Sequence, residues 1–327
     1  MSAPRFRWWP TSFLGWVVAA PVAILGIFTT IRLLGIDKGP LVMAVALTPL
    51  VAAASLLVLV LAVLSRSWVL MATVGLCVVL QATWLAPSFT GDGSTSTGPA
   101  VMTVMTSNVL HGEADATDLV AQVQSHKVDL LSVQELTPDF AAELAAAGLA
   151  NTLPYSYTRP TADFKGIGLW SRYPLSDDRY YRIQWSVPTL VTDVAVPGLP
   201  LTFVAAHPMA PAPIHDATWV TEQEFLRFIL GQLSGPVIVA GDFNASLDHR
   251  TVRALTDDGF VDAARQAGTG WQPTFPVNYN VPPLFTPDHI MARDTGLVAT
   301  DVVAVPIAKS DHKALVVTYR RAGPPSG

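Results

Sequence analysis

The sequence predicts a chain of two parts, an N-terminal membrane module of helices followed by a layered α/β sandwich. The first observation is composition: 50% of the 327 residues are hydrophobic and only 14% are charged, against about 25% charged residues in a typical soluble domain. The second is the concentration of the apolar excess in the first 87 residues. The third is the alternation of short β-type runs with helical segments after residue 100. Together they exclude a single ordinary soluble domain.

Three apolar stretches define the membrane module, which we expect to occupy residues 1–87. They cover residues 12–34, 41–64 and 68–86, and a membrane-spanning helix needs roughly 20 apolar residues. Burial of all three in one soluble core is an alternative that their combined length disfavours. A cleaved signal peptide is a second alternative, which the length of the first stretch and the two stretches after it disfavour.

Basic residues near the ends of these stretches predict the orientation of the module. Arg5, Arg7 and Arg66 fall on one side, and Arg32 and Lys38 on the other, which favours a cytoplasmic N-terminus. Three spans then place the rest of the chain outside the cell, after a flexible linker at residues 88–99 that is rich in Gly, Ser and Thr. Arginine outnumbers lysine 15 to 5, which with abundant alanine indicates a bacterial source and therefore a multi-pass protein of the bacterial plasma membrane.

A globular domain is expected over residues 100–321, followed by a short tail at 322–327. The alternation of predicted strands and helices in this domain favours a layered α/β sandwich, because the strands outnumber the helices. The one cysteine, Cys77, lies in the apolar region, so no intrachain disulfide can form. The predicted strands cover residues 101–109, 128–133, 168–171, 190–196, 201–206, 236–240, 288–292, 301–305 and 314–319, and the predicted helices cover 117–126 (capped by Thr117), 139–148 and 218–233.

Polar residues that can do chemistry stand at the ends of these strands. Strand ends on one rim of a sheet converge in space even when they are far apart in the sequence, and sites on sheet scaffolds are commonly built there. The residues are Asn108, Glu135, His207, Asp242, Asn244, Asp288, Asp311 and His312.

These residues belong to an ordered set of short signatures. The signatures are Thr106-Ser107-Asn108, Gln134-Glu135, residues 168–174, His207-Pro208, Gly241-Asp242-Phe243-Asn244, Pro287-Asp288-His289 and Ser310-Asp311-His312. Each one alone is weak, but the complete set in this order resembles the endonuclease/exonuclease/phosphatase superfamily of metal-dependent phosphoesterases. The resemblance covers residues 102–319 and implies an α/β four-layer sandwich of the DNase-I-like type.

Phosphoester hydrolysis needs a positioned water and neutralisation of charge on the phosphoryl oxygens. A divalent cation meets the second need, and hard cations prefer carboxylate oxygens. We therefore expect Mg²⁺ (or Mn²⁺) with Glu135 as a ligand and Asn108 orienting Glu135 or completing the metal shell. The resemblance places Asp311 near the metal. The alternatives are a solvated glutamate and a turn-forming asparagine.

Asp242 and Asn244 are two residues apart, so in an extended segment their side chains face the same way. A carboxylate beside an amide suits a base that activates water, with an orienting partner, and the resemblance implies this role for Asp242. A direct metal role for Asp242, or an Asx-type turn at this position, are the alternatives.

His312 is the expected electrophilic histidine, which when protonated would stabilise negative charge on the phosphoryl group. Remaining protonated requires a carboxylate neighbour, and the resemblance implies Asp288. His207 would contact a second phosphoryl oxygen or protonate the leaving oxygen, with Asp163 or Asp193 as its acidic partner. We expect ordinary structural or surface roles for the remaining histidines: His111, His126, His215, His249 and His289, the last packing beside Asp288.

Substrate contacts are expected from His207, Asn244 and Lys165. Lys165 lies beside the signature at 168–174, and its alternative is a solvated loop lysine. Residues 207–213 contain three prolines and predict a stiff loop next to the site.

Three functions compete at this point. The first is a membrane-anchored, metal-dependent phosphoesterase acting outside the cell on a phosphate or pyrophosphate ester, with a membrane lipid or lipid-linked phosphate as partner. Its layout is similar to a group of actinobacterial three-span membrane proteins, some associated with glycopeptide resistance. The second is a tethered extracellular nuclease, which the 15 basic against 23 acidic residues after residue 99 disfavour. The third is a non-catalytic binding or scaffold protein, which the complete set of site residues disfavours.

Overall fold

The computed structural model describes residues 6–183, 186–211 and 216–323. Arg5 and His215, named in the expectations above, lie outside this part of the chain. Residues 212 and 213 of the expected stiff loop and residues 324–327 of the expected tail also lie outside it. The chain divides into two compact units. Met1–Pro87 with Asp248–Arg250 form one, and Ser88–Leu247 with Thr251–Gly327 form the other.

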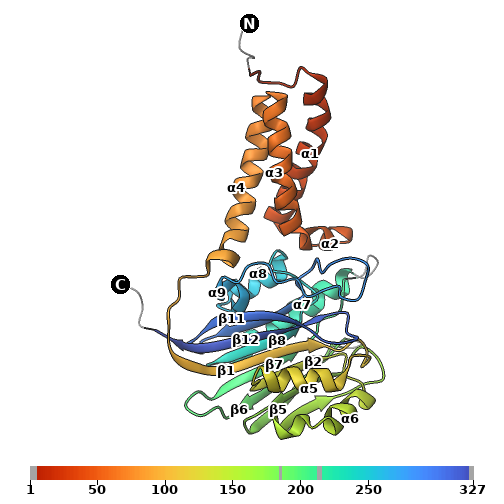
Figure 1. The fold of residues 1–327 in the computed structure, drawn as a ribbon, viewed down its shortest axis with the longest axis vertical. Helices are drawn as coiled ribbons and strands as arrows, with labels where there is room; N and C mark the ends of the chain where they lie inside the picture. The colour runs from red at the N-terminus through yellow and green to blue at the C-terminus, as the bar shows by residue number, and fades with distance from the viewer. Residues whose placement is uncertain (1–5, 184–185, 212–215, 324–327) are drawn as a thin grey trace. The chain divides into compact units, whose positions relative to one another are not determined.

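The first unit contains three helices that are long and apolar enough to cross a membrane, as the sequence predicts. Val18 and Val22 of the first helix share one buried apolar cluster with Leu70 and Val74 of the third, and the three helices run side by side (Figure 1). Many of their other large apolar side chains are exposed, which suits faces that meet lipid. The helices are α1 (Phe13–Leu34), α3 (Thr48–Ser65) and α4 (Trp68–Thr90).

The apolar stretch at residues 41–64 is not one continuous helix. A short helix, α2 (Pro40–Ala46), ends before Leu47, and α3 begins at Thr48. Pro49 explains the break, because proline has no N–H to donate to the carbonyl four residues earlier and its ring collides with that carbonyl.

Three buried polar side chains connect the apolar helices. Gln81 of α4 donates from Nε2 to Thr29 Oγ1 of α1 at 3.1 Å, and Ser55 of α3 donates from Oγ to Gln81 Oε1 at 2.7 Å. Hydrogen bonds of this kind between membrane helices contribute on the order of 1 kcal/mol each. They fix which faces of the three helices meet.

Two mixed six-stranded sheets form the second unit. In spatial order the first sheet contains β11 (Leu297–Pro306), β12 (Lys313–Ala322), β1 (Ser96–Asn108), β2 (Leu130–Gln134), β4 (Ile167–Ser171) and β3 (Tyr155–Arg159). The second contains β5 (Leu175–Tyr181), β6 (Thr189–Val194), β7 (Leu201–Ala206), β8 (Val237–Asp242), β10 (Asp288–Arg293) and β9 (Val261–Asp262).

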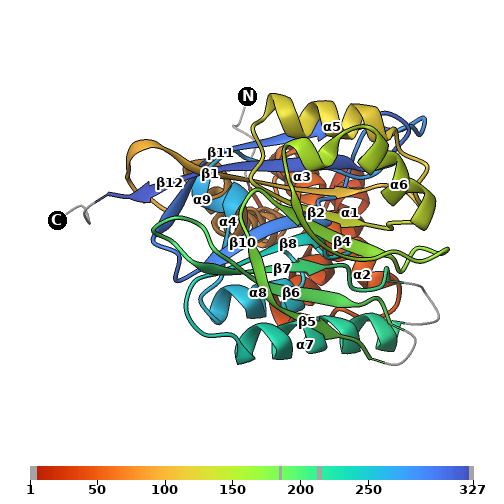
Figure 2. The same cartoon turned by 90° about the horizontal axis from the view of Figure 1, so that it is seen from below.

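Helices cover the outer faces of both sheets. The helical elements of this unit are α5 (Ala116–Ser125), α6 (Pro138–Ala146), the 3₁₀ turn η1 (Leu149–Asn151), α7 (Asp216–Gln232), α8 (Arg250–Asp257) and α9 (Ala263–Ala267). Figure 2 shows α5 and α6 on the first sheet, and α7 and α8 on the second. Leu130, Leu169 and Phe203 belong to the core between the sheets, while Leu119 of α5 and Phe140 of α6 belong to a second core between these helices and the first sheet. This order of layers confirms the predicted four-layer α/β sandwich.

Several local expectations differ from the structure. Asp115, not Thr117, caps α5, because its carboxylate accepts the N–H groups of Thr117 and Asp118. Residues 88–99, expected as a flexible linker, contain the end of α4 and the start of β1. Ser96 pairs with Ala322, since β12 is long enough to offer it hydrogen-bond partners.

The strand directions explain how distant residues reach one edge of the sandwich. β1 and β2 are parallel neighbours in one sheet, and β7 and β8 are parallel neighbours in the other, so the carboxyl ends of each pair lie together. β12 runs antiparallel to β1 and β10 antiparallel to β8, which brings their starting residues to the same edges.

Candidate functional site

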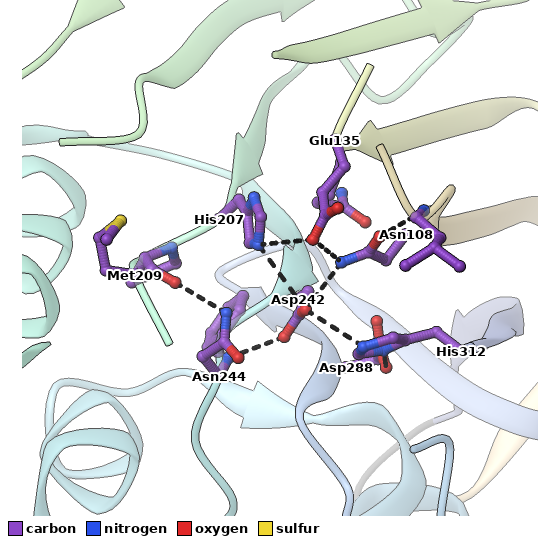
Figure 3. A network of polar contacts seen from close by, with 12 residues as sticks. Asn108, Glu135, His207, Met209, Asp242, Asn244, Asp288 and His312 are labelled. Atoms are coloured by element: carbon purple, nitrogen blue, oxygen red, sulfur yellow. Dashed lines mark hydrogen bonds and ion pairs between the residues drawn. The ribbon is translucent and has the colours of Figure 1, made fainter. Parts of the chain in front are cut away.

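A network of polar side chains lies where these strand ends meet. Asn108 ends β1, Glu135 follows β2, His207 follows β7 and Asp242 ends β8. Asp288 opens β10 directly opposite Asp242 in the ladder, and His312 precedes β12. Figure 3 shows that these side chains, from six strands, point toward one another. The structure therefore brings together seven of the predicted residues: Asn108, Glu135, His207, Asp242, Asn244, Asp288 and His312.

Asn108 connects two carboxylates. Its Nδ2 lies 3.0 Å from Glu135 Oε1 and 3.1 Å from Asp242 Oδ2, and its Oδ1 accepts the N–H of Leu110. Glu135 adopts a left-handed backbone with φ of 62°, a conformation that costs a non-glycine residue about 1 kcal/mol or more. The N–H of His111 donates to Glu135 Oε2 at 2.8 Å, which fixes the carboxylate in place.

His207 faces the same two carboxylates. Its Nε2 lies 3.7 Å from Asp242 Oδ2 and 4.0 Å from Glu135 Oε1. Its buried Nδ1 has no hydrogen-bond partner among the described residues. The predicted acidic partners were wrong, because Asp193 pairs with Arg179 at 2.8 Å and Asp163 pairs with Lys165 at 3.5 Å.

His312 is held by Asp288, as the resemblance implies. The distance from His312 Nδ1 to Asp288 Oδ2 is 2.9 Å, and Thr274 donates from Oγ1 to the same carboxylate oxygen at 2.6 Å. The ring of Phe275 packs 4.7 Å from the imidazole, centroid to centroid. Burial lowers the pKa of His312, but the carboxylates of Asp288 and Asp242 outweigh burial and raise it to about 10. The imidazole is therefore a cation at neutral pH, with its Nε2 3.7 Å from Asp242 Oδ2.

The loop that follows Asp242 holds its carboxylate in place. Its Oδ1 accepts the N–H of Asn244 at 2.8 Å, and Asn244 donates from Nδ2 to the carbonyl of Pro208 at 3.0 Å. Gly241 permits this arrangement, since a Cβ at that position would lie 1.8 Å from the carbonyl oxygen of Ala206 on the neighbouring strand. The Asp242 and Asn244 side chains thus serve different partners, and the Asx-type turn weighed as an alternative is part of the geometry.

Two groups of side chains could hold a divalent cation. Asp242, Asp288 and His312 offer ligand atoms within 4.8 Å of one another, but a protonated His312 already paired with Asp288 has no lone pair free for a metal. Glu135 and Asp242 suit a hard cation better, because their oxygens converge on a single amide, that of Asn108. Two carboxylates held this close repel each other unless positive charge lies between them. The donor set therefore fits a hard divalent cation at Glu135.

Asp311 lies close enough to Glu135 and Asp242 for their charges to act on it. Burial raises the pKa of Asp311, and the charges of Glu135 and Asp242 raise it further against the opposing effect of His312. Lys165 is not part of the network. It lies in the loop before β4, over the ring of Phe164 at 5.5 Å and beside Asp163.

Four residues that sequence reasoning did not assign to the site also contact it. Ser310 donates from Oγ to the Asn108 carbonyl and accepts the N–H of His312. It was visible as part of the signature at 310–312, whereas Thr274 and Phe275 lie in an irregular loop with no pattern to mark them. His111, expected to be ordinary, lies with Nε2 3.3 Å from Glu135 Oε2.

His289 has a structural position, as expected, but its partner is not Asp288. Its Nδ1 lies 2.9 Å from Asp262 Oδ2 and its Nε2 3.0 Å from the carbonyl of Ala245. All of this is buried. The pair anchors the segment just after Asp242 and Asn244.

Comparison with known proteins agrees with this geometry. The model of the Endonuclease/Exonuclease/phosphatase family matches residues 105–312. No curated protein matches the chain.

A solved structure of D. rerio TDP2 humanized by 14 mutations is 16% identical with a TM-score of 0.58, and the match covers 67% of this chain and 98% of that one. An endonuclease/exonuclease/phosphatase from Beutenbergia cavernae is 21% identical with a TM-score of 0.51, covering 70% and 74% of the two chains. Identities this low show a shared fold alone.

Proposed function

The chain belongs to the endonuclease/exonuclease/phosphatase family, and from that premise we propose that it is a divalent-metal-dependent phosphoesterase anchored in a membrane by its apolar helices. Its substrate is a phosphate or pyrophosphate ester that is itself lipid-linked, hydrolysed on the outer face of the bacterial plasma membrane. The observation that carries the proposal is the convergence of Glu135, Asp242 and a protonated His312 at one edge of the sandwich. The link of this layout to glycopeptide resistance stays a prediction.

Each residue has a distinct task in this mechanism. Glu135 and Asn108, with Asp311 nearby, would hold Mg²⁺ or Mn²⁺, which when bound neutralises negative charge on the phosphoryl oxygens. Asp242 accepts a proton from the attacking water, and the N–H of Asn244 orients its carboxylate.

The two histidines act on the substrate side. His312 is kept protonated by Asp288 and donates from Nε2 to a phosphoryl oxygen, where negative charge develops in the transition state. His207 donates from Nε2 to a second phosphoryl oxygen or to the leaving oxygen, and Asn244 contributes to substrate binding.

A metal-dependence assay on a general diester tests the proposal. The full chain, purified in detergent, should hydrolyse bis(p-nitrophenyl) phosphate with Mg²⁺ or Mn²⁺. EDTA should stop the reaction, and restored metal should restart it.

Asp242→Asn should reduce the rate by at least about a hundredfold, the scale of a general base, with an unchanged circular dichroism spectrum. Asp301→Asn, the same change at an exposed position of β11, is the control. Parental activity in Asp242→Asn would remove the proposed base, and no metal-dependent hydrolysis would favour the non-catalytic alternative.

A further inference from the structure

A groove of about 530 Å³ lies beside the loop that precedes β4. Its volume is in the range of sites that hold small molecules. Residues from the segments 158–165, 180–182 and 188 line it, and the polar ones that matter here are Arg159, Asp163, Lys165, Tyr180 and Arg182.

The groove is positively charged in a domain that is not. Three of its lining residues are basic and one is acidic, whereas the chain after residue 99 has 15 basic and 23 acidic residues. Asp163 accounts for only one of the positive charges, because it pairs with Lys165. Neither Arg159 nor Arg182 forms an ion pair within the described ranges of the chain. Two guanidinium groups therefore face solvent in the groove with no carboxylate to neutralise them.

The basic side chains are held in place by their neighbours. The guanidinium of Arg159 lies 4.8 Å from the ring centroid of Tyr157 and 5.8 Å from that of Tyr180. Arg182 donates from Nε to the carbonyl of Ser186 at 3.1 Å, which leaves its terminal nitrogens available. Ordering a side chain before a ligand arrives reduces the entropy lost on binding. Such an arrangement favours a bound anion over a merely solvated surface.

The groove adjoins the predicted metal ligand through the backbone. Leu136, the residue after Glu135, donates its N–H to the carbonyl of Gly166 at 3.0 Å and accepts the N–H of Thr161 at 3.1 Å. A Cβ at Gly166 would lie 1.8 Å from the Leu136 carbonyl oxygen, so only glycine allows the loop to come this close. The backbone at Gly166, the residue after Lys165, therefore lies about one strand spacing, roughly 5 Å, from the chain at Leu136.

A second path of contacts connects the same two places through side chains. His111 Nε2 lies 3.3 Å from Glu135 Oε2, and the ring of His111 lies 6.1 Å from that of Phe164. Lys165 Nζ lies 5.5 Å from the centroid of the same phenyl ring. The groove therefore borders the surroundings of Glu135 on the side where Lys165 lies.

We propose that the groove binds a second phosphoryl group of the substrate, carried on the same small headgroup as the phosphate ester that is hydrolysed. The inference rests on the proposed function and narrows its substrate class to headgroups with at least two phosphoryl groups. Arg159 and Arg182 bind the second group by charge-assisted hydrogen bonds, and Lys165 contributes a positive charge at the side nearest Glu135.

Binding calorimetry on the full chain in a non-ionic detergent tests this, with EDTA present so that no turnover occurs. The probes are inositol 1-phosphate and inositol 1,4-bisphosphate, which differ only in the second phosphate. The bisphosphate should bind at least about tenfold tighter. Arg159→Gln combined with Arg182→Gln should remove that advantage, because each charge-assisted contact contributes about a factor of ten. Equal affinity for the two probes, or an advantage that survives the double variant, would overturn the proposal.

Two further probes separate other sources of the same anion. If inorganic phosphate alone bound as tightly as the bisphosphate and was lost in the double variant, the groove would be a site for free phosphate, and the substrate assignment would be wrong. A single-stranded oligonucleotide that bound tighter still, with the same dependence on Arg159 and Arg182, would assign the groove to a nucleic-acid backbone and equally overturn it.

A matched charge change provides the control. Arg321→Gln removes one positive charge from the opposite end of β12, eight residues and therefore roughly 27 Å from Lys313, and should leave both affinities unchanged. Because the readout is binding in EDTA, the result does not depend on whether the chain hydrolyses a diester. A failure of this inference can thus be told apart from a failure of the proposed hydrolysis, because the two are measured separately.

Discussion

At the scale of single residues, the candidate site depends on backbone conformations that most side chains avoid. Glu135 and Asn244 both have positive φ, 62° and 49°; Glu135 directly follows β2, and Asn244 lies two residues after the end of β8. The strain is offset by hydrogen bonds to the same residues: His111 N–H to Glu135, and Asn244 to Asp242 and Pro208. The carboxylates therefore meet at fixed positions before any ligand binds.

Gly241 gives the sharpest residue-scale prediction. Gly241→Ala places a Cβ 1.8 Å from the Ala206 carbonyl oxygen, so β7 and β8 must separate in a fully buried part of the sheet. We expect a loss of about 3 kcal/mol in the free energy of unfolding, and a fall in hydrolysis because His207 and Asp242 adjoin these two residues. Thermal unfolding and hydrolysis rates measure the two effects.

The control is a glycine-to-alanine substitution at a position where the added Cβ meets no neighbouring atom. Gly231 lies in α7 with no atom within 4 Å of an added Cβ, so Gly231→Ala should be neutral or stabilise the fold by up to about 1 kcal/mol. Equal stability of the two variants would contradict the tight approach of β7 and β8.

How far the sequence predicts the site depends on the kind of contact. Strand-end residues such as Asp242 and His312 were predictable, because short signatures mark them and the sheet gathers them. The partner of His207 was not, since Asp193 and Asp163 are bound by Arg179 and Lys165 in the folded chain, and competition for charge appears only in three dimensions.

At the scale of elements, the buried strands were predicted and the exposed or irregular elements were missed. β7 is wholly buried and apolar except for Thr202, and it was predicted with its observed bounds. β5 contains Asp177, Asp178 and Arg179 and is mostly exposed, so it has no apolar alternation to indicate a strand. α2 and α3 read as one stretch because composition, not the position of Pro49, dominates such a prediction.

Helix α7 contains a carboxylate that makes the fold sensitive to pH. Glu222 is buried, and its Oε2 accepts the N–H of Met209 at 2.9 Å, while its Oε1 has no hydrogen-bond partner among the described residues. Burial raises the pKa of Glu222 to about 7, although the N–H of Met209 and the charge of Lys165 act in the opposite direction. The folded chain therefore holds this proton more tightly than the unfolded chain does.

The sign of the pH dependence follows from that difference. The protonated carboxyl contributes its full stability below the unfolded pKa of about 4.5, and that contribution is lost as pH rises through the folded pKa of about 7. Between pH 5 and pH 8 it amounts to on the order of 2 kcal/mol. Glu222→Gln should thus lose less stability over this range than the parent chain in thermal unfolding.

A neighbouring glutamate isolates the effect. Glu224 lies on the same helix and is exposed, so Glu224→Gln should keep the pH dependence of the parent. Because all other titrating groups are common to the three proteins, the difference between the two variants reports Glu222. A slope in Glu222→Gln as steep as that of the parent would show that this carboxyl is already charged in the folded chain at pH 5.

At the scale of the whole molecule, the number of apolar helices sets the predicted topology. Three helices that all cross a membrane would place the two ends of the chain on opposite sides of it, and Arg7 and Arg66 favour a cytoplasmic N-terminus. We expect a C-terminal alkaline phosphatase fusion to be active and a C-terminal fusion to a reporter that fluoresces only in the cytoplasm to be dark. The reverse pattern would move the globular unit to the cytoplasm.

The same covalent arrangement leads to the substrate prediction. Only residues 91–95 separate the end of α4 from the start of β1, and five extended residues span at most about 17 Å. A domain joined to a membrane helix by so short a segment would stay at the membrane surface and encounter a lipid-linked phosphate at a raised effective concentration. The acidic excess after residue 99, 23 acidic against 15 basic residues, slows the approach of a large polyanion.

The chain should therefore hydrolyse a polyprenyl pyrophosphate or a phospholipid with a higher kcat/KM than plasmid DNA, when all three are compared in the same detergent, metal and salt. A higher kcat/KM on plasmid DNA than on both lipids would replace the lipid substrate with the tethered nuclease, because neither tethering nor charge would then have governed the choice.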